Sequence, residues 1–183
     1  MKLILASKSP RRKEILEMAG YSFDVKVSNV DENVDANSIS EMSLKISKKK
    51  CDAVFLENKD SVVISADTIV VINDRVLEKP KSKDDCREMI NLIQNNVHDV
   101  YTSVVVKSKD KEIQFLETTK VYVCAMSEQE IEDYINTTEP YDKAGGYAIQ
   151  GVFGKYIEKI DGDYYNVMGL PICKLNKVLK EMI

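Results

Sequence analysis

Two arginines at an expected helix start are the first residues suited to chemistry. Ser9 and Pro10 predict a helix N-terminus, because Ser is a favoured N-cap and Pro suits the first helical position. Arg11 and Arg12 follow, although the helix dipole already makes this end positive. With Ser7, the first-turn N–H groups and two forked guanidiniums favour a bound phosphate. Acidic side chains one turn further on offer the alternative of a neutralised, exposed pair: Glu14 and Glu17.

A carboxylate inside a strongly apolar stretch is the second candidate. Asp67 interrupts "VVISADTIVV", and a carboxylate buried there without a partner is costly. One interpretation is a ligand for a hard cation, or a general base. The other is an Asp at a strand end that caps neighbouring backbone. Asp31 and Glu32 alone indicate a solvated acidic turn, whereas together with Asp67 they complete an oxygen-ligand site for Mg²⁺.

Other charged residues lie beside expected strand ends: Lys50, Lys79, Asp142 and Lys143. Lys50 belongs to a run of lysines and Lys79 precedes a proline, so a solvated position is the simple interpretation of each. The single histidine, His98, is predicted to be structural. The sequence contains no P-loop, no G-x-S-x-G elbow and no H-E-x-x-H motif, which weighs against P-loop, serine-hydrolase and zinc-protease classes.

The composition is that of one ordinary globular domain. The chain has 183 residues, of which 44% are hydrophobic and 31% charged. A net charge of -4 gives no reason to expect a nucleic-acid or membrane surface. Four widely spaced cysteines, without a C-x-x-C pair, indicate reduced packing thiols of a cytoplasmic protein: Cys51, Cys86, Cys124 and Cys173. The longest apolar run, residues 62–72, is too short to span a bilayer.

Strands and helices alternate in the first half of the expected fold. A short strand over residues 2–5 leads into the helix that begins at Ser9 and ends at Gly20. A strand at 23–27, a lysine-rich helix at 38–56 and buried strands at 62–66 and 69–72 follow. Asn73 and Asp74 predict a hairpin turn, and Lys79-Pro80 ends the returning strand. Another helix begins near Ser82.

The second half is expected to be richer in antiparallel strands. Residues 100–106 and 114–125 alternate as an antiparallel pair. Ser127 and Glu130 form a capping box that opens a helix through residue 134. Residues 161–162 predict a hairpin turn, and a C-terminal helix follows Pro171 and ends near 182. The predicted class is therefore α/β with a mixed sheet.

Six segments resemble, in order and spacing, the motifs of the Maf family of nucleoside triphosphate pyrophosphatases. They read "LILASKSPRRKEIL", "NVDE", "SADTIVV", "LEKPKSKDDCREMI", "VYTSVVV" and "EPYDKAGGYAIQGVFGKYIEKIDGDYYNVMGLPI". The resemblance covers nearly the whole chain and implies one such domain over residues 1–183. It implies a long curved mixed sheet flanked by helices, with two lobes around a cleft, similar to inosine triphosphate pyrophosphatases.

The resemblance also assigns roles to individual residues. It places five on the phosphates of a nucleoside triphosphate: Ser7, Arg11, Arg12, Lys50 and Lys79. Glu32 and Asp67 fall at the catalytic carboxylates, which also bind the divalent cation, Mg²⁺ or Mn²⁺. The match at Lys50 is the loosest, because Lys48 and Lys49 are its neighbours. A homodimer is expected, with no nucleic-acid or membrane partner.

The branch of the family is indicated by three positions. Arg11, Thr68 and Gln150 match the branch that acts on dTTP and UTP, whereas the branch acting on 7-methyl-GTP tends to have Trp, Gln and Glu there. Two positions depart from the family pattern, because Glu78 and Ser103 stand where glycine is usual. A pyrimidine nucleotide pyrophosphatase is therefore expected, and a 7-methyl-GTP pyrophosphatase is an alternative.

The expected mechanism has no covalent intermediate, because the sequence shows no activated Ser or Cys. Asp67 orients or deprotonates a water that attacks the anhydride between the α and β phosphates, and the cationic residues neutralise the pyrophosphate leaving group. The rival hypothesis is a non-catalytic, nucleotide-sensing regulator of septum formation. Such a regulator needs the cations but not Asp67.

Overall fold

The computed structural model describes residues 2–182, and the chain forms two compact units in it. Within the described residues, unit 1 comprises 2–67, 102–117 and 169–182, and unit 2 comprises 68–101 and 118–168. Each unit has its own apolar cluster and is described separately below. That residues 1–183 act as one domain stays a prediction.

One seven-stranded sheet runs through the fold in the order β2-β1-β3-β5-β6-β7, with β4 paired to β3. The strands are β1 (Lys2–Leu5), β2 (Asp24–Val25), β3 (Ser61–Ile72), β4 (Arg75–Leu77), β5 (Val97–Lys107), β6 (Glu112–Val123) and β7 (Ile157–Asp161). β1 pairs in parallel with β2 and β3, whereas β4 and β7 pair antiparallel with β3 and β6. The sheet is mixed, which confirms the predicted α/β class.

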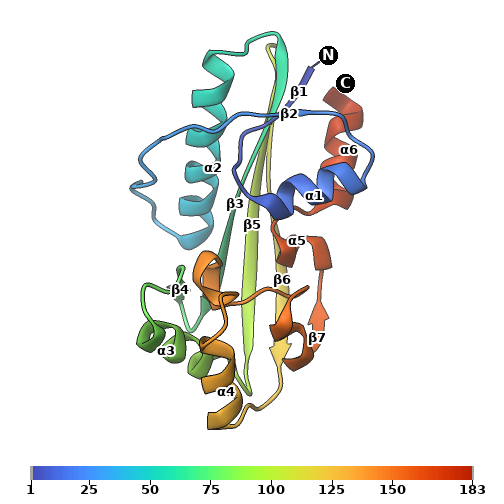
Figure 1. The fold of residues 1–183 in the computed structure, drawn as a ribbon. Helices are drawn as coiled ribbons and strands as arrows, with labels where there is room; N and C mark the ends of the chain where they lie inside the picture. The colour runs from blue at the N-terminus through green and yellow to red at the C-terminus, as the bar shows by residue number, and fades with distance from the viewer. Residues whose placement is uncertain (1, 183) are drawn as a thin grey trace. The chain divides into compact units, whose positions relative to one another are not determined.

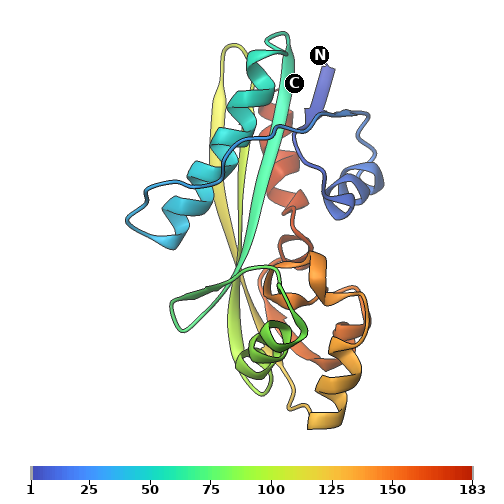
Figure 2. The same ribbon diagram turned by 60° about the vertical axis from the view of Figure 1, so that its left-hand side comes forward.

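In unit 1 the strands lie between α2 (Ile39–Leu56) on one side and α1 (Pro10–Met18) and α6 (Ile172–Met182) on the other (Figures 1 and 2). Helix α2 packs through Cys51 and Val54 against apolar side chains of the sheet: Ile4, Ala6, Val63 and Val105. The opposite face of the helix exposes Lys45 and Lys49 to solvent. Helix α2 is therefore amphipathic, and its inner face has a fixed register on the sheet.

Unit 2 has a larger apolar cluster that includes aromatic side chains. Helices α3 (Lys83–Ile93) and α4 (Glu128–Ile135) pack against each other, and α5 (Tyr164–Met168) follows β7. Short 3-10 turns span Pro140–Asp142, Ala144–Gly146 and Val152–Tyr156. Phe153 has no exposed surface and contacts the rings of Tyr134, Tyr147 and Tyr156. This cluster holds the segment that carries Gln150.

Most local signals in the sequence are confirmed. Helix α1 begins after Ser9 and ends before Gly20, which has a φ of 81° and donates its N–H to the carbonyl of Glu17. Asn73 and Asp74 both have positive φ, at 50° and 60°, and join β3 to β4. The capping box of Ser127 and Glu130 is present at the start of α4.

One prediction about strands is wrong and another is only partly right. Residues 161–162 do not form a hairpin, because β7 is followed by helix α5. Helix α5 follows this turn because the Asp163 carboxylate accepts the N–H groups of Tyr165 and Asn166 at 2.7 and 3.3 Å, as an N-cap does. The strand expected at 23–27 is reduced to the two residues of β2 at the sheet edge.

The cysteine prediction is half right, since Cys51 and Cys86 are buried whereas Cys124 and Cys173 are exposed. Burial raises the pKa of the Cys51 thiol to about 12 and that of Cys86 to about 11, so both stay protonated. They are packing residues, as expected. Within residues 2–182 no helix combines the length and the apolar character needed to span a bilayer.

His98 is buried in unit 2, where its Nε2 lies 2.6 Å from the hydroxyl of Tyr147. Burial lowers the pKa of His98 to about 4. The unfolded chain therefore binds a proton below pH 6.5 that the folded protein does not bind until about pH 4. His98 contributes stability above pH 6.5 that is lost as the pH falls through this window.

We expect the free energy of unfolding to fall by about 2 kcal/mol between pH 6.5 and 4.5 through His98 alone. Urea unfolding at both pH values measures this change. The His98→Gln variant, which keeps a polar group toward Tyr147, should lose about that much of the pH dependence. Equal pH dependence in the two proteins would contradict the assignment.

Candidate active site

The start of helix α1 holds one arginine in a fixed position. Arg12 Nη1 donates to Ser7 Oγ at 3.0 Å, and its Nε donates to the carbonyl of Gly169 at 2.9 Å. Burial lowers the pKa of Arg12, attraction to Asp67 and Glu32 opposes this shift, and repulsion from Arg11 adds to it. A guanidinium stays charged despite such a shift. Arg12 is thus a partly buried cation whose direction is set before any ligand binds.

The alternative was an exposed arginine pair neutralised by acidic residues on α1, whereas Arg12 is partly buried. Glu17 instead lies 3.6 Å from the ammonium of Lys13. The side chain of Ser7 also accepts the backbone N–H of Ser9 at 3.2 Å, so it shapes the turn that leads into α1. The side chain of Ser9 makes no capping hydrogen bond of its own.

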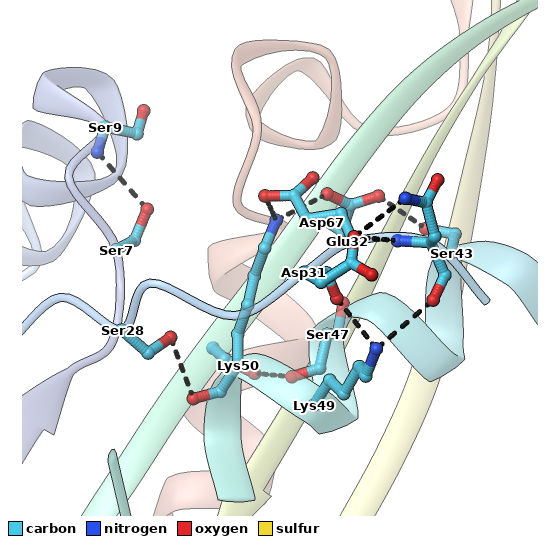
Figure 3. Close-up of polar contacts among 12 residues, drawn as sticks. Ser7, Ser9, Ser28, Asp31, Glu32, Ser43, Ser47, Lys49, Lys50 and Asp67 are labelled. Atoms are coloured by element: carbon cyan, nitrogen blue, oxygen red, sulfur yellow. Dashed lines mark hydrogen bonds and ion pairs between the residues drawn. The ribbon is translucent and has the colours of Figure 1, made fainter. Parts of the chain in front are cut away.

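A second group joins α2, β3 and the loop between β2 and α2 (Figure 3). Lys50 Nζ lies 3.0 Å from Asp67 Oδ1 and 3.0 Å from Glu32 Oε1. Asp67 is only 9% exposed, whereas the side chain of Glu32 is 58% exposed. One ammonium therefore holds two carboxylates together. It also gives the buried Asp67 carboxylate the compensating positive charge that a position inside an apolar strand requires.

The structure decides which lysine of the run "KKK" belongs to this group. Lys48 points to the carboxylates of Asp52 and Glu112, at 3.2 and 2.7 Å. Lys49 points to backbone carbonyls of the β2–α2 loop, and Lys50 alone of the three contacts Asp67. The choice follows from the helical register, since neighbouring residues on a helix face directions 100° apart.

Lysines of α2 also anchor the loop that carries Glu32. Lys49 Nζ donates to the carbonyls of Asp31 and Asn33, at 2.8 and 3.2 Å, on either side of Glu32. Lys45 Nζ donates to the carbonyl of Asp35 at 2.7 Å. Asp31 Oδ1 accepts the N–H of Asn33 at 3.0 Å, so its carboxylate stabilises the loop through a local hydrogen bond. Glu32 is the acidic residue that the structure pairs with Asp67.

Sequence reasoning missed the hydroxyl groups behind Asp67. Ser43 Oγ lies 3.4 Å from Asp67 Oδ2, and Ser103 Oγ lies 2.8 Å from Ser43 Oγ. A signal for them exists, because Ser43 and Ser47 are spaced i, i+4 on the inner face of an amphipathic helix, where apolar residues are expected. Ser103 was noted only as a departure from the family pattern.

The remaining candidates belong to unit 2. Thr68 is partly buried and directly follows Asp67 along β3, whereas Lys79 and Gln150 are exposed. The turn after Gln150 is held by Glu139, whose carboxylate accepts the N–H groups of Val152 and Phe153 at 2.6 and 3.1 Å. A Cβ at Gly151 would lie 2.2 Å from that carboxylate, so a side chain there would displace Glu139 from the turn. Asp142 and Lys143 form an ion pair with each other.

The residues around Asp67 suit a divalent cation that also contacts a substrate. Within the described part of the chain, no three His, Cys, Asp or Glu side chains gather into a complete metal cage. Mg²⁺ is usually held by one or two carboxylates together with substrate phosphates rather than by such a cage. Glu32 and Asp67 already share one cation, the Lys50 ammonium, so the donor set fits the group.

Comparison with known proteins supports both the fold and the family. The structure of the Staphylococcus aureus Ham1 protein aligns over the full length of both chains with a TM-score of 0.55 at 12% identity, which is a likeness of fold. The family model of the Maf-like proteins matches residues 2–182. The chain belongs to the Maf-like protein family, which confirms the predicted resemblance.

The relatives at higher identity are named for one activity. A dTTP/UTP pyrophosphatase of Bacillus cereus (strain G9842) is 44% identical over 181 residues, which cover 98% of this chain and 95% of that protein. A dTTP/UTP pyrophosphatase of Bacillus anthracis (strain CDC 684 / NRRL 3495) is 45% identical with the same coverage. These proteins belong to the predicted branch of the family.

We expect the Lys49→Ala variant to loosen the loop around Glu32 without unfolding the protein, because its ammonium contacts only exposed backbone. Hydrogen exchange of peptides covering residues 30–36 should accelerate about threefold to tenfold. The matched control is Lys13→Ala, which removes an exposed lysine of α1. Unchanged exchange in Lys49→Ala would show that the loop is held by other contacts.

Proposed function

We propose that this protein hydrolyses dTTP and UTP to the nucleoside monophosphate and pyrophosphate. The names of its relatives support the substrates. The observation that carries the chemistry is the pair of carboxylates, Asp67 and Glu32, held 3.0 Å from one ammonium and electrostatically coupled to Arg12. Such a set combines a base with cations for an anionic leaving group.

Cations bind and neutralise the triphosphate. Arg12 offers a guanidinium whose direction is fixed by Ser7 and Gly169, so little conformational freedom is lost when a phosphate binds. Ser7, Arg11, Lys50 and Lys79 join it in the proposed phosphate site. Their positive charge stabilises the negative charge that develops on pyrophosphate as it leaves.

Asp67 takes a proton from the attacking water. The water oxygen bonds to one phosphorus of the α–β anhydride, the proton passes to the Asp67 carboxylate, and the bond from that phosphorus to the bridging oxygen breaks. Lys50 holds Asp67 Oδ1 at 3.0 Å and keeps the carboxylate in one orientation. Glu32 shares Lys50 and completes the acidic side of the site.

A divalent cation, Mg²⁺ or Mn²⁺, is part of the proposal, with Glu32 and Asp67 as its protein ligands. When bound it would polarise phosphate oxygens and reduce their repulsion of an incoming nucleophile. The support from this chain is that both carboxylates already share one cation. Lys50 would then balance the charge of the two carboxylates beside the metal.

The base preference is proposed to reside in Gln150, with Thr68 and Arg11. Uracil and thymine present an acceptor, a donor and an acceptor, and a neutral amide can pair with two of them. Gln150 is exposed, and its turn is fixed through Glu139 and Gly151. A fixed turn supports a specific role for the amide.

The family resemblance extends the proposal to the cellular setting. It supports a cytoplasmic homodimer that clears excess or modified pyrimidine nucleotides and takes part in the control of cell division. Size-exclusion chromatography with light scattering tests the oligomeric state. A monomer at micromolar concentration would remove the dimer from the proposal without affecting the hydrolytic site.

We expect Asp67→Asn to lower kcat for dTTP at least about a hundredfold with the fold intact, because the base is lost. Pyrophosphate release with and without Mg²⁺ measures this, over a panel of canonical nucleotides. The matched control, Asp35→Asn, changes an exposed Asp of the Glu32 loop and should stay within about twofold of wild type. Tight nucleotide binding by a wild type without turnover would favour the nucleotide-sensing alternative.

We expect Gln150→Glu to lower kcat/KM for dTTP and UTP about tenfold to a hundredfold, because a carboxylate faces the O4 acceptor and cannot donate to it. The loss for 7-methyl-GTP should be smaller, since guanine offers N–H donors. Gln129→Glu, an exposed change on α4, is the control. An equal loss for all three nucleotides would remove Gln150 from base recognition.

A further inference from the structure

Three buried hydroxyl groups form a continuous chain that ends at the carboxylate of Asp67. Ser43 and Ser47 lie one turn apart on α2, Ser103 lies on β5, and none of the three has exposed surface. Ser43 Oγ is 3.4 Å from Asp67 Oδ2 and 2.8 Å from Ser103 Oγ, which in turn is 2.5 Å from Ser47 Oγ. Figure 3 shows Ser43 beside Asp67, with Ser47 one turn along α2.

The number of protons gives this chain a direction. Each hydroxyl has one proton, and an ionised carboxylate only accepts, so Ser43 donates to Asp67. Ser103 Oγ lies 2.8 Å from both the hydroxyl and the carbonyl of Ser43, and its single proton is shared between these two acceptors. Ser47 Oγ in turn lies 2.5 Å from Ser103 Oγ and 3.3 Å from the Ser103 carbonyl.

We propose that Ser43 is a positioning residue for Asp67 and that Ser103 fixes the direction of the Ser43 hydroxyl. Lys50 holds Oδ1 and Ser43 holds Oδ2, so the two contacts together set the plane of the carboxylate. The torsion that turns this plane is soft in Asp, and one contact alone would leave it free to rotate. The role of Asp67 in this inference rests on the proposed function.

Ser103 holds the main chain of the same residue as well. Its Oγ lies 3.5 Å from the Asp67 carbonyl, so the serine chain contacts both the side chain and the backbone of Asp67.

The test compares Ser43→Ala and Ser103→Ala with Ser65→Ala. Ser65 is equally buried and donates to the Ser47 carbonyl at 2.6 Å, so its loss disturbs the same packing without touching Asp67. Pyrophosphate release from dTTP should show kcat about tenfold lower in Ser43→Ala and several-fold lower in Ser103→Ala, with KM within about twofold. Ser65→Ala should keep its kcat, and Ser43→Thr should recover most of it.

Equal kcat in Ser43→Ala and Ser65→Ala would overturn the inference. Should Ser43→Ala fail to fold, Ser103→Ala decides by the same comparison. Binding of Mn²⁺ alone, followed by electron paramagnetic resonance, is independent of turnover, and it should weaken about threefold or more in Ser43→Ala but not in Ser65→Ala. That binding pattern in a protein without pyrophosphate release would reject the proposed function and keep the inference. Equal Mn²⁺ binding in all variants would overturn the inference.

Discussion

The central constraint of unit 1 is a carboxylate inside an apolar strand. Asp67 is 9% exposed in β3, and a charge in such a place persists only with a cation and hydrogen-bond donors around it. Helix α2 supplies both from one face, because Ser43 and Lys50 lie two turns apart. The compensation of this one charge thus adds to the apolar packing of α2 on the sheet, and through Lys50 it brings the Glu32 carboxylate beside Asp67.

The features that the sequence predicted correctly depend on local physics. A Pro after an N-cap residue, an Asn-Asp turn with two positive φ angles and a capping box each involve only neighbouring residues. Asp67 was identified for a different reason, since the cost of burying it required a partner. That reasoning identified Asp67 as a site residue but did not predict which side chains contact it. The missing parts were contacts between residues far apart in the chain.

The hydrogen bond from Arg12 to the Gly169 carbonyl is such a contact, because it joins residues from opposite ends of the chain. The choice of Lys50 over Lys48 and Lys49 follows from the face of α2 that packs on the sheet, whereas its contact with Asp67 joins two separate elements. The hairpin predicted at residues 161–162 failed for a related reason. A turn dipeptide indicates a change of chain direction, and the capping residue after it determines whether a strand or a helix follows.

The Glu32 loop and the strand that carries Asp67 are held by forces of different kinds. The loop is anchored by exposed ammonium groups on carbonyls and by an ion pair whose acidic side chain is 58% exposed. Dissolved salt weakens such exposed charge–charge contacts, whereas the apolar packing around β3 does not depend on charge attraction. Rising ionic strength would therefore weaken the hold on Glu32 more than the hold on Asp67, which is 9% exposed. The composition of the surrounding electrolyte thus becomes a physical control over how completely the site is assembled.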